Sequence, residues 1–436
     1  MNSNDLKTSR SIPRLAGLVC ACALLAGIPG GAAAVSISGQ TDTIFRLGQS
    51  AVEKRDLYPL YEYLRLSVTN IDKNGNLSFH IGGWGRADLA DKTTDRYTDT
   101  DLQYGFLSYR PAQNNLVLNA GRQFVTEGVA AERLDGLYLR SDLAAGFGAA
   151  LFVGSPVVTE PNFNGGDLVY GGRISHSYGN YYTIGLSALQ TDYAGSRLRE
   201  EEGVDLWLRP FASVEVVGRS SYNSITSGWM EHAYTVSYTP RDRLRITADL
   251  AAINYEDYFY HVTTSALSLT NGILDPREKM LAVGGGVSYT PISALTLAAD
   301  YRNYGYDIAG DADYFGGKAT VTVAGFAAGL SVHRMSGESD RLRYDEYRLF
   351  ASKKLGKADL TVDFFDIDYD RSINGIKNTF SLAGAATYEI TDQFKVGADV
   401  DYSRNPDFDN EVRGLVKISY VFDATYRAEG GGKSEK

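Results

Sequence analysis

The chain has 436 residues, and its 53 acidic residues outnumber 43 basic ones, which gives a formal net charge of −10. An acidic chain without a basic run is a poor binder of polyanions, so we expect no nucleic-acid partner. Glycine (46) and tyrosine (30) are abundant while methionine (4) and tryptophan (3) are scarce, and few stretches have a helical period. The composition therefore predicts an all-β protein.

The first residues predict a secretory signal peptide over 1–34. A positively charged start precedes an apolar run at 15–28, and small residues follow at 30–34. Such a run is too short for a membrane-spanning helix. Both cysteines, Cys20 and Cys22, lie inside this segment. The remaining chain therefore has no thiol for a disulfide, a metal site or a nucleophile.

The stretch from Trp229 to Tyr255 shows the pattern that organises the chain. Residues alternate with a period of two on both sides of a turn at Pro240. Such alternation predicts an antiparallel hairpin. The even-numbered row from Met230 to Tyr238 is assigned to the lipid side, and the row with charged residues to the inside. Each strand has about 10 residues, enough for a tilted strand to cross a bilayer.

The same alternation continues along the chain, and its connections fall into two sets. Short turns are predicted at 110–111, 141–142, 178–180, 209–210, 239–240, 290–291, 355–357 and 390–392. Longer connections are predicted between them, at 154–167, 191–203, 255–280, 304–313, 370–377 and 403–411. Tight turns at one end and long loops at the other are typical of outer-membrane barrels. The sequence therefore predicts a single transmembrane antiparallel β-barrel in the bacterial outer membrane, surrounded by lipid.

The strand count depends on the stretch 314–335. A first count gives 21 strands, whereas single-chain bacterial barrels have an even number, so that both termini lie in the periplasm. The apolar parity switches at Ala324-Gly325. A turn there gives about 22 strands, whereas a bulge leaves the count at 21. We predict about 22 strands, with 20 or 18 as the alternatives. We predict a barrel over 35–422 and a periplasmic polar tail over 423–436.

The inward rows carry charges that predict the walls of a lumen. Arginine dominates the N-terminal half, and acidic residues join it in the C-terminal half. An arginine-rich wall facing an acidic wall selects polar solutes, whereas ordinary paired charges select nothing. The candidates are Arg65, Arg122, Arg140, Arg173, Arg209, Arg245, Asp249, Asp300, Arg302, Glu346, Arg348, Asp399 and Asp401.

No pattern of catalytic or metal-binding residues is found. The five histidines are scattered, and there is no C-x-x-C-H sequence for covalent haem. We expect no enzyme activity and no cofactor. The connection 255–280 either folds into the lumen as a constriction or lies on the surface.

One short segment resembles known outer-membrane channels. Gly121-Arg122-Gln123, followed by 132–136 (E-R-L-D-G), is similar to a pattern in alginate-export-like porins and in the barrel partners of multihaem cytochrome conduits. The resemblance implies that Arg122, Arg133 and Asp135 lie where a strand meets an external loop. It also implies two alternatives to a simple channel: a polysaccharide-export porin, and a sheath that holds a cytochrome partner.

The predicted function is an outer-membrane, porin-like channel that passes small hydrophilic solutes through a charged lumen. The sequence does not specify the solute.

Overall fold

A computed structural model describes residues 35–49, 56–90, 98–113, 115–157, 167–193, 195–258, 275, 277–406 and 410–426. The predicted signal peptide and most of the connection 255–280 lie outside these residues. Nearly all of the described residues belong to strands. The strands are β1 (Val35–Gln49), β2 (Asp56–Leu57), β3 (Pro59–Thr69), β4 (Leu77–Asp88), β5 (Thr98–Tyr109), β6 (Val117–Glu127), β7 (Ala130–Asp142), β8 (Phe147–Pro156), β9 (Leu168–Tyr178), β10 (Tyr182–Tyr193), β11 (Ser196–Phe211), β12 (Val214–Asn223), β13 (Gly228–Arg241), β14 (Leu244–Asn254), β15 (Lys279–Ile292), β16 (Leu295–Tyr306), β17 (Ala312–Val323), β18 (Phe326–Gly337), β19 (Arg343–Leu355), β20 (Ala358–Ile373), β21 (Ile376–Glu389), β22 (Phe394–Arg404) and β23 (Glu411–Tyr426).

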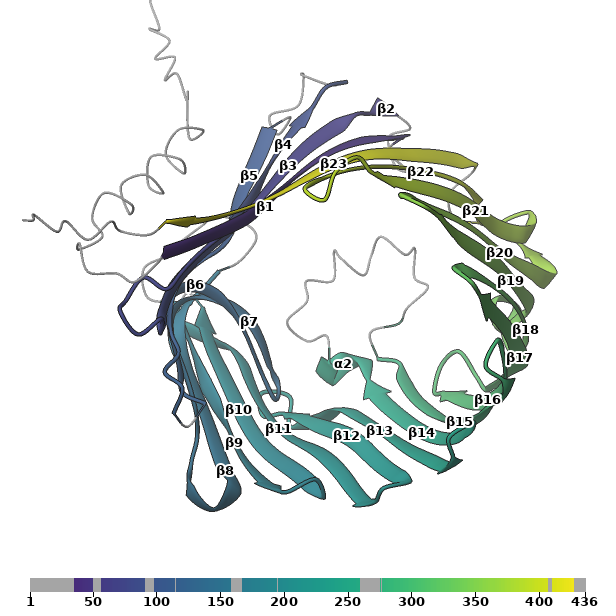
Figure 1. Ribbon diagram of the computed structural model, residues 1–436. Coiled ribbons are helices and arrows are strands. Elements are labelled where there is room, and N and C mark those ends of the chain that lie inside the picture. Colours follow the sequence, from purple (N-terminus) through teal and green to yellow (C-terminus); the bar gives the residue numbers. More distant parts are fainter. Residues whose placement is uncertain are drawn as a thin grey trace, which may run out of the picture.

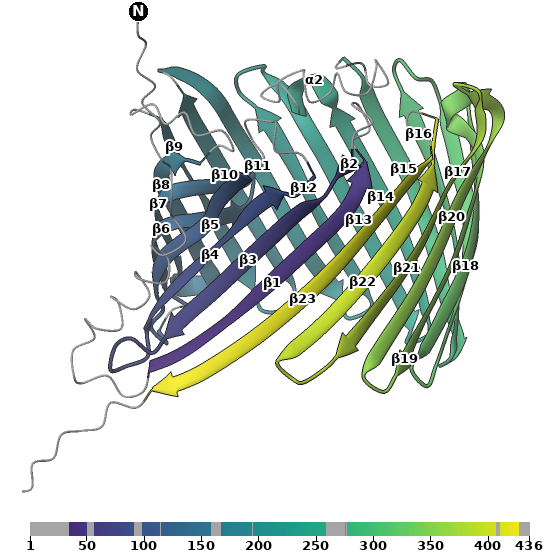
Figure 2. The ribbon, with the colours of Figure 1, turned by 90° about the horizontal axis from the view of Figure 1, so that it is seen from above.

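These strands form one closed antiparallel barrel (Figure 1). Each strand pairs with the next along the chain, and β1 closes the ring by pairing with β23. β2 and β3 both pair with β1 and are separated by one residue, so they act as one spanning strand. The barrel therefore has 22 strands, and the predicted count is confirmed. The strands are strongly tilted (Figure 2), as closure of a barrel requires.

Short connections gather at one end of the barrel, as predicted. Three of them share a design in which a proline sits in a bulge just before a two-residue turn. The prolines are Pro210, Pro240 and Pro291, and the register shifts beside each. Proline has no N–H for the ladder, so a bulge accommodates it. The strands continue one residue beyond each proline before they turn.

The parity switch at Ala324-Gly325 is a turn between β17 and β18. Both residues have positive φ (45° and 72°), as in the tight turns that join twisted strands. Two strands, not one bulged strand, therefore occupy 314–335.

Three predicted long connections are wrong. β10 and β11 are joined by two residues within 191–203, and β20 and β21 turn at Asn374-Gly375 within 370–377. Half of 304–313 also belongs to β16 and β17. Polar composition marked these segments as loops, but polar strands can continue above the apolar band of a barrel wall.

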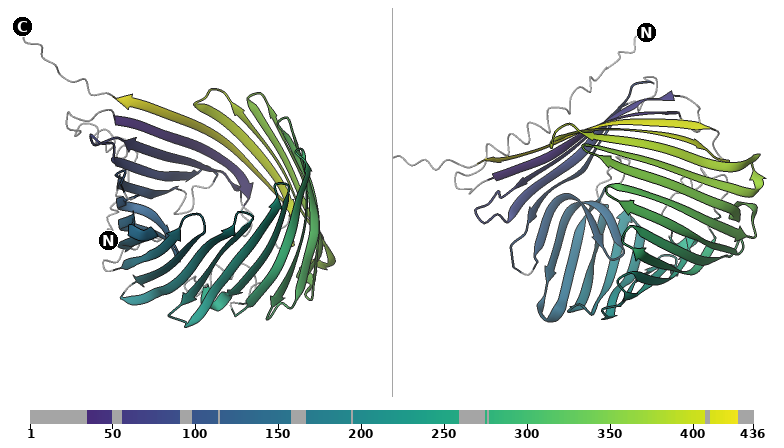
Figure 3. Two further views of the ribbon diagram at one scale, coloured as in Figure 1. Left: turned by 60° about the horizontal axis from the view of Figure 1, so that its bottom comes forward. Right: turned by 45° about the vertical axis from the view of Figure 1, so that its right-hand side comes forward.

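The closing seam extends the barrel beyond its predicted end. Figures 2 and 3 show β1 and β23 side by side, purple beside yellow. Tyr426 pairs with Val35, so the last strand runs past the predicted boundary at Phe422. The ladder with β1 explains the extension, because each added residue of β23 still has a partner. The start of β1 and the end of β23 both lie at the short-turn end of the barrel, where Ser36 of β1 pairs with Thr69 at the end of β3.

The hairpin 229–255 forms as predicted, with one correction to its outer row. Val236 (40%) and Tyr238 (44%) are exposed, as expected of a lipid-facing row. Met230, assigned to the same row, is buried, and Trp229 is exposed instead. A bulge between Trp229 and Glu231 in the pairing with β12 switches the parity.

Helix is almost absent from the described part of the chain. It contains α2 (Tyr255–Tyr258) and two single-turn 3-10 helices at Ala144–Gly146 and Asp340–Leu342. None of the described helices is long and apolar enough to cross a membrane.

Candidate functional site: a hairpin folded into the barrel

The hairpin formed by β6 and β7 departs from the barrel wall. Figure 1 shows β7 on the inner side of β8, β9 and β10, closer to the centre of the ring. β6 pairs with β5 only where Gly105–Tyr109 faces Leu118–Arg122. Beyond Arg122 the two strands separate. The outer half of the hairpin, which ends in a two-residue turn at Gly128-Val129, thus occupies part of the lumen.

A row of glycines lies at the level where the wall bends. Gly121 of β6 faces Gly136 of β7, and Gly136 faces Gly154 of β8. We call these three residues the glycine belt. Gly121 has a φ of 128°, and a Cβ on Gly136 would overlap the carbonyl oxygen of Val153. Aligned glycines let strands approach closely and kink, so the belt permits the bend.

An apolar core fills the space between the hairpin and the wall behind it. Its buried members come from both sides, and Val129 and Tyr138 pack against them. Fully burying a large apolar side chain contributes about 1.5–3 kcal/mol, so this cluster is a substantial force holding the hairpin in place. The members are Val125, Ala130, Leu134, Phe152, Val169 and Leu189.

The tip of the hairpin docks on β10 and β11. The backbone N–H of Val129 donates to Ser187 Oγ at 3.0 Å. Gly203, which faces Ser187 across the ladder, lies so close to Val129 that a Cβ there would overlap its side chain. The tip therefore packs closely against both residues, Ser187 through a hydrogen bond and Gly203 through the absence of a side chain.

A buried ion network joins the hairpin to β11. Arg199 makes a two-bond contact with Glu201, at 2.8 Å for each bond, and also pairs with Glu132 of β7. The side chains are 16% (Arg199), 3% (Glu201) and 14% (Glu132) exposed. Removing the arginine would leave two carboxylates with little access to solvent, and such a loss is strongly destabilising.

Two arginines of the hairpin reach back across the gap to β5. Arg122 donates to the carbonyl oxygen of Leu102 at 3.1 Å, and Arg133 pairs with Asp101. Arg122 also forms a two-bond pair with Asp135, at 2.7 and 2.8 Å. These side chains tether the hairpin where backbone pairing with β5 has ended.

The segment that resembles other channels is therefore this hairpin. The resemblance implied that Arg122, Arg133 and Asp135 lie where a strand meets an external loop. The structure places them on the folded-in hairpin, and its loop has only two residues.

The arginines predicted to form one wall are mostly paired with carboxylates. Arg65 contacts Asp42 at 3.1 Å, and Arg140 contacts Glu127 at 3.6 Å. Arg122 contacts Asp135, Arg173 contacts Asp205 (2.8 and 2.5 Å), and Arg348 contacts Asp363 (2.6 Å). Arg245 donates to Ser237 Oγ at 2.9 Å. Arg209 donates at 3.2 Å to the carbonyl oxygen of Ala212, which lies in a short turn.

Within the described part of the chain, the predicted acidic residues are also partnered, with the exception of Asp399. Asp249 pairs with Arg302 at 2.6 Å, so the structure brings these two candidates together. Asp300 contacts His333 at 3.1 Å, Glu346 accepts from Tyr314 at 3.2 Å, and Asp401 accepts from Ser381 at 2.6 Å. Asp399 lies opposite Ala385 and Leu415 in the ladder. Of the two alternatives, a basic wall facing an acidic wall or ordinary paired charges, these contacts favour paired charges.

The seam of the barrel has a charged cluster that the sequence analysis did not identify. Asp42 of β1, 3% exposed, contacts Arg65 of β3 and both Lys417 (3.2 Å) and Ser419 (2.6 Å) of β23. One buried carboxylate thus links the first strand to both neighbours. A pocket of about 400 Å³ adjoins it, lined by Tyr63, Gly83, Gln103, Tyr104 and Ile44.

Both ends of the connection 255–280 are described, and they meet where the backbone N–H of Tyr255 donates to the carbonyl oxygen of Glu278 at 3.0 Å. α2 follows β14 directly, and Asp257 accepts from Asn254 while its carbonyl accepts from Asn223 at 3.1 Å. Whether the connection constricts the lumen stays a prediction, since residues 259–274 lie outside the described part. Within that part no group of three metal-ligating side chains occurs.

Comparison with known proteins identifies the fold. No protein-family model and no curated protein matches the sequence. The siderophore receptor PirA from Acinetobacter baumannii is 10% identical, with 88% of this chain and 80% of that chain covered and a TM-score of 0.55. A mutant of the ferric enterobactin receptor PfeA from Pseudomonas aeruginosa is 11% identical, with the same coverage and a TM-score of 0.54. The outer membrane protein opdK from P. aeruginosa is 9% identical over 89% of this chain and 99% of that chain, with a TM-score of 0.46.

At these identities the likeness shows the fold alone. Together with the closed ring of strands, it defines the class of fold: this chain is a closed antiparallel β-barrel of 22 strands, like the barrels of outer-membrane proteins.

Proposed function

We propose that this barrel is a passive channel for small hydrophilic solutes, and that the folded-in hairpin narrows its lumen. The observation that carries the proposal is the position of the outer half of the β6–β7 hairpin inside the ring, held there by an apolar core and a buried ion network. An element fixed in a lumen limits the size of what passes.

We assign the predicted charged residues to the lumen wall, except Arg209, which lies near the end of β11 and donates to the turn residue Ala212. The assignment is supported by their alternation with exposed apolar side chains, which face lipid in an outer-membrane barrel. Because nearly every arginine has a carboxylate or hydroxyl partner, we expect weak selectivity between anions and cations, unlike that of an unbalanced arginine wall.

Conductance of the purified chain in planar bilayers tests this proposal. We expect stable single-channel current steps. Polyethylene glycols small enough to enter the lumen should reduce the conductance of each step. A folded barrel with no conductance would contradict the proposal. The sheath alternative predicts a haem partner, visible as a Soret band after gentle solubilisation. The export alternative requires a bore wide enough for a polymer, which the hairpin makes less favourable.

We further propose that both termini and the short turns face the periplasm. The even number of strands supports a shared side for the termini. An epitope inserted at Gly356, in a short turn between β19 and β20, should stay inaccessible on intact cells. One inserted at Gly375, in the opposite turn, should be accessible. The reverse result would invert the orientation.

A further inference from the structure

The outer face of β3 carries an exposed carboxylate halfway up the barrel wall. Glu62 shares its row with Leu60 on one side and Leu64 on the other. Side chains of one row point to the same face of a strand, and Leu64 is 43% exposed, so this row is the outward one. Glu62 is itself exposed and lies about midway between Asp56 and Thr69, the two ends of the spanning strand. Its depth is therefore central whichever end of the barrel faces the periplasm.

Two threonines of β1 hydrogen-bond to this carboxylate on the same outer face. The hydroxyl of Thr43, which stands opposite Glu62 in the ladder, donates to Glu62 Oε2 at 2.6 Å. The hydroxyl of Thr41 donates to Glu62 Oε1. Farther along the same row of β1, Leu47 is 44% exposed. These three polar side chains thus interrupt the apolar rows of β1 and β3.

The neighbouring strand leaves space beside the carboxylate. In β4, Gly85 stands opposite Glu62 and Gly83 stands opposite Leu64, so no side chain covers Glu62 from that strand. Figure 2 shows β4, β3 and β1 side by side on the near side of the barrel. Small residues beside polar ones are typical of contacts between proteins within a membrane, because they let two backbones approach closely.

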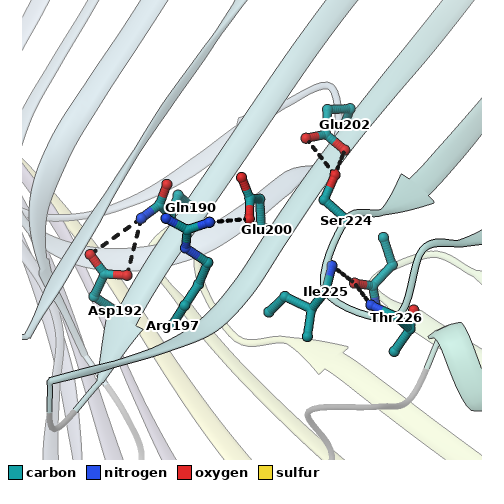
Figure 4. A network of polar contacts seen from close by, with 9 residues as sticks. Gln190, Asp192, Arg197, Glu200, Glu202, Ser224, Ile225 and Thr226 are labelled. Carbon is teal, nitrogen blue, oxygen red and sulfur yellow. Dashed lines mark hydrogen bonds and ion pairs between the residues drawn. The ribbon is translucent and has the colours of Figure 1, made fainter.

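Two carboxylates on the outer face of β11 have a different environment. Glu200 and Glu202 lie near one end of that strand, beside the turn at 224–226 (Figure 4). Arg197 contacts Glu200, and the hydroxyl of Ser224 donates to Glu202 at 2.8 and 2.9 Å. Carboxylates at a strand end are accessible to water. Glu62 lies instead between leucines in the middle of its strand, where an ionisable group is costly.

We propose that this part of the wall joins two copies of the chain within the membrane. The contact is centred on the Glu62 patch, which comprises Glu62, Thr41, Thr43, Gly83 and Gly85. A contact between identical surfaces across a two-fold axis must be self-complementary. The patch meets this requirement because it holds two hydroxyl donors and a carboxylate acceptor at one depth. A second copy would also remove the carboxylate from lipid.

The size of the surrounding surface suits such a contact. The five neighbouring strands β23, β1, β3, β4 and β5 are about 4.8 Å apart, and the apolar band of a barrel is about 25 Å tall. Their outer face therefore offers on the order of 600 Å² to a partner. A standard interface buries about 800 Å² on each side, so a flat contact over these strands is of comparable size.

Single-cysteine crosslinking in isolated outer membranes tests the proposal. Both native cysteines lie in the predicted signal peptide, so the unaltered chain is the blank. Leu60→Cys and Leu64→Cys flank Glu62 in the outward row, and oxidation of at least one of them should give a product of twice the chain's mass. Leu250→Cys is the matched control, because Leu250 is 38% exposed on the outer face of β14, across the ring (Figure 1).

We expect at least about tenfold more dimer from the better of the two test positions than from the control. Dimer from neither test position, or equal amounts from test and control, would overturn the proposal. A product of another mass would also overturn it, because a different outer-membrane protein would then be the occupant.

A second measurement asks whether the carboxylate itself holds the two copies together. In the better crosslinking variant, Glu62→Leu removes the acceptor and should weaken association about tenfold. Glu62→Gln keeps a hydrogen-bonding group and should retain most of the dimer. Heat-modifiable gel mobility and unchanged single-channel conductance would show that both variants fold. An unchanged amount of dimer in Glu62→Leu would overturn the assignment of the patch.

Discussion

β6 to β8 and β16 to β18 have the same alternating pattern and tight turns, yet only the first set contains a hairpin, β6 and β7, that leaves the wall. β17 pairs with β16 from Leu295 to Tyr304, nearly the full strand, whereas β6 pairs with β5 over less than half of its length. Glycines occur in both sets. In β17 they face larger residues, such as His333 opposite Gly316, whereas in β6 to β8 they face one another.

This contrast teaches that alignment of glycines, not their number, decides where a barrel wall can bend. A single glycine beside larger residues leaves the ladder supported on both sides. Three in adjacent strands remove the side chains that would hold those strands apart. Buried contacts on the inner side then determine the direction of the bend.

Arg199→Met should have the largest effect on the hairpin that distinguishes β6 to β8 from β16 to β18. Loss of this side chain leaves Glu132 and Glu201 without their shared cation, and we expect the barrel to lose about 3–5 kcal/mol of stability. The unfolding midpoint by circular dichroism measures this. Arg209→Met is the control, because the only hydrogen bond of the Arg209 side chain among the described residues is to the carbonyl oxygen of the turn residue Ala212. Equal losses in both variants would show that the network does not hold the hairpin.

Gly136→Ala should destabilise the barrel by about 1–3 kcal/mol, as overpacking does, because its Cβ overlaps the backbone of β8. Gly384→Ala is the matched control: Gly384 has open space around it and should change stability by less than about 0.5 kcal/mol. Denaturant midpoints compare the two. If they agree, close approach at the belt is not required.

Ser187→Ala removes the acceptor for the Val129 N–H and should cost about 1 kcal/mol. The expected sign of local undocking is faster hydrogen exchange at Val129, with no change at the turn Ala324-Gly325. Exchange that rises equally at both turns would point to global loosening instead.

Arg348→Gln gives the smallest expected change in stability, below about 1 kcal/mol, since the Arg348–Asp363 pair is partly exposed. Asp363 then has no cation partner among the described residues, so we expect the reversal potential in a salt gradient to shift toward cation selectivity. An unchanged reversal potential would place this pair outside the conducting path, and a shift toward anions would contradict the prediction.

Period-two alternation predicted most of the fold, including the count of 22 strands. It did so because each barrel strand exposes one row to lipid and one to the interior. The turn at Ala324-Gly325 was visible as a change of parity. The boundary at Phe422 failed because the pairing of Tyr426 with Val35 joins opposite ends of the chain.

Period-two alternation could not predict the folded-in hairpin, because the contacts that hold it join residues distant in sequence, such as Glu132 and Arg199. Alternation also placed charges on a face without their partners, so Arg173 was assigned to an open wall although Asp205 neutralises it. One local signal was available. Gly121 and Gly136 lie symmetrically about the turn Gly128-Val129, which a hairpin converts into a facing pair.

The most direct test of the central claim is single-channel conductance after removal of the folded-in part. Arg122 and Asp135 face each other in the ladder, so an Asn-Gly turn can replace 123–134 and join them. The control replaces 368–378 in the same way, between facing residues Ile367 and Thr379. We expect a clearly larger conductance for the first variant and little change for the second. Equal conductance in both, with both folded, would contradict it.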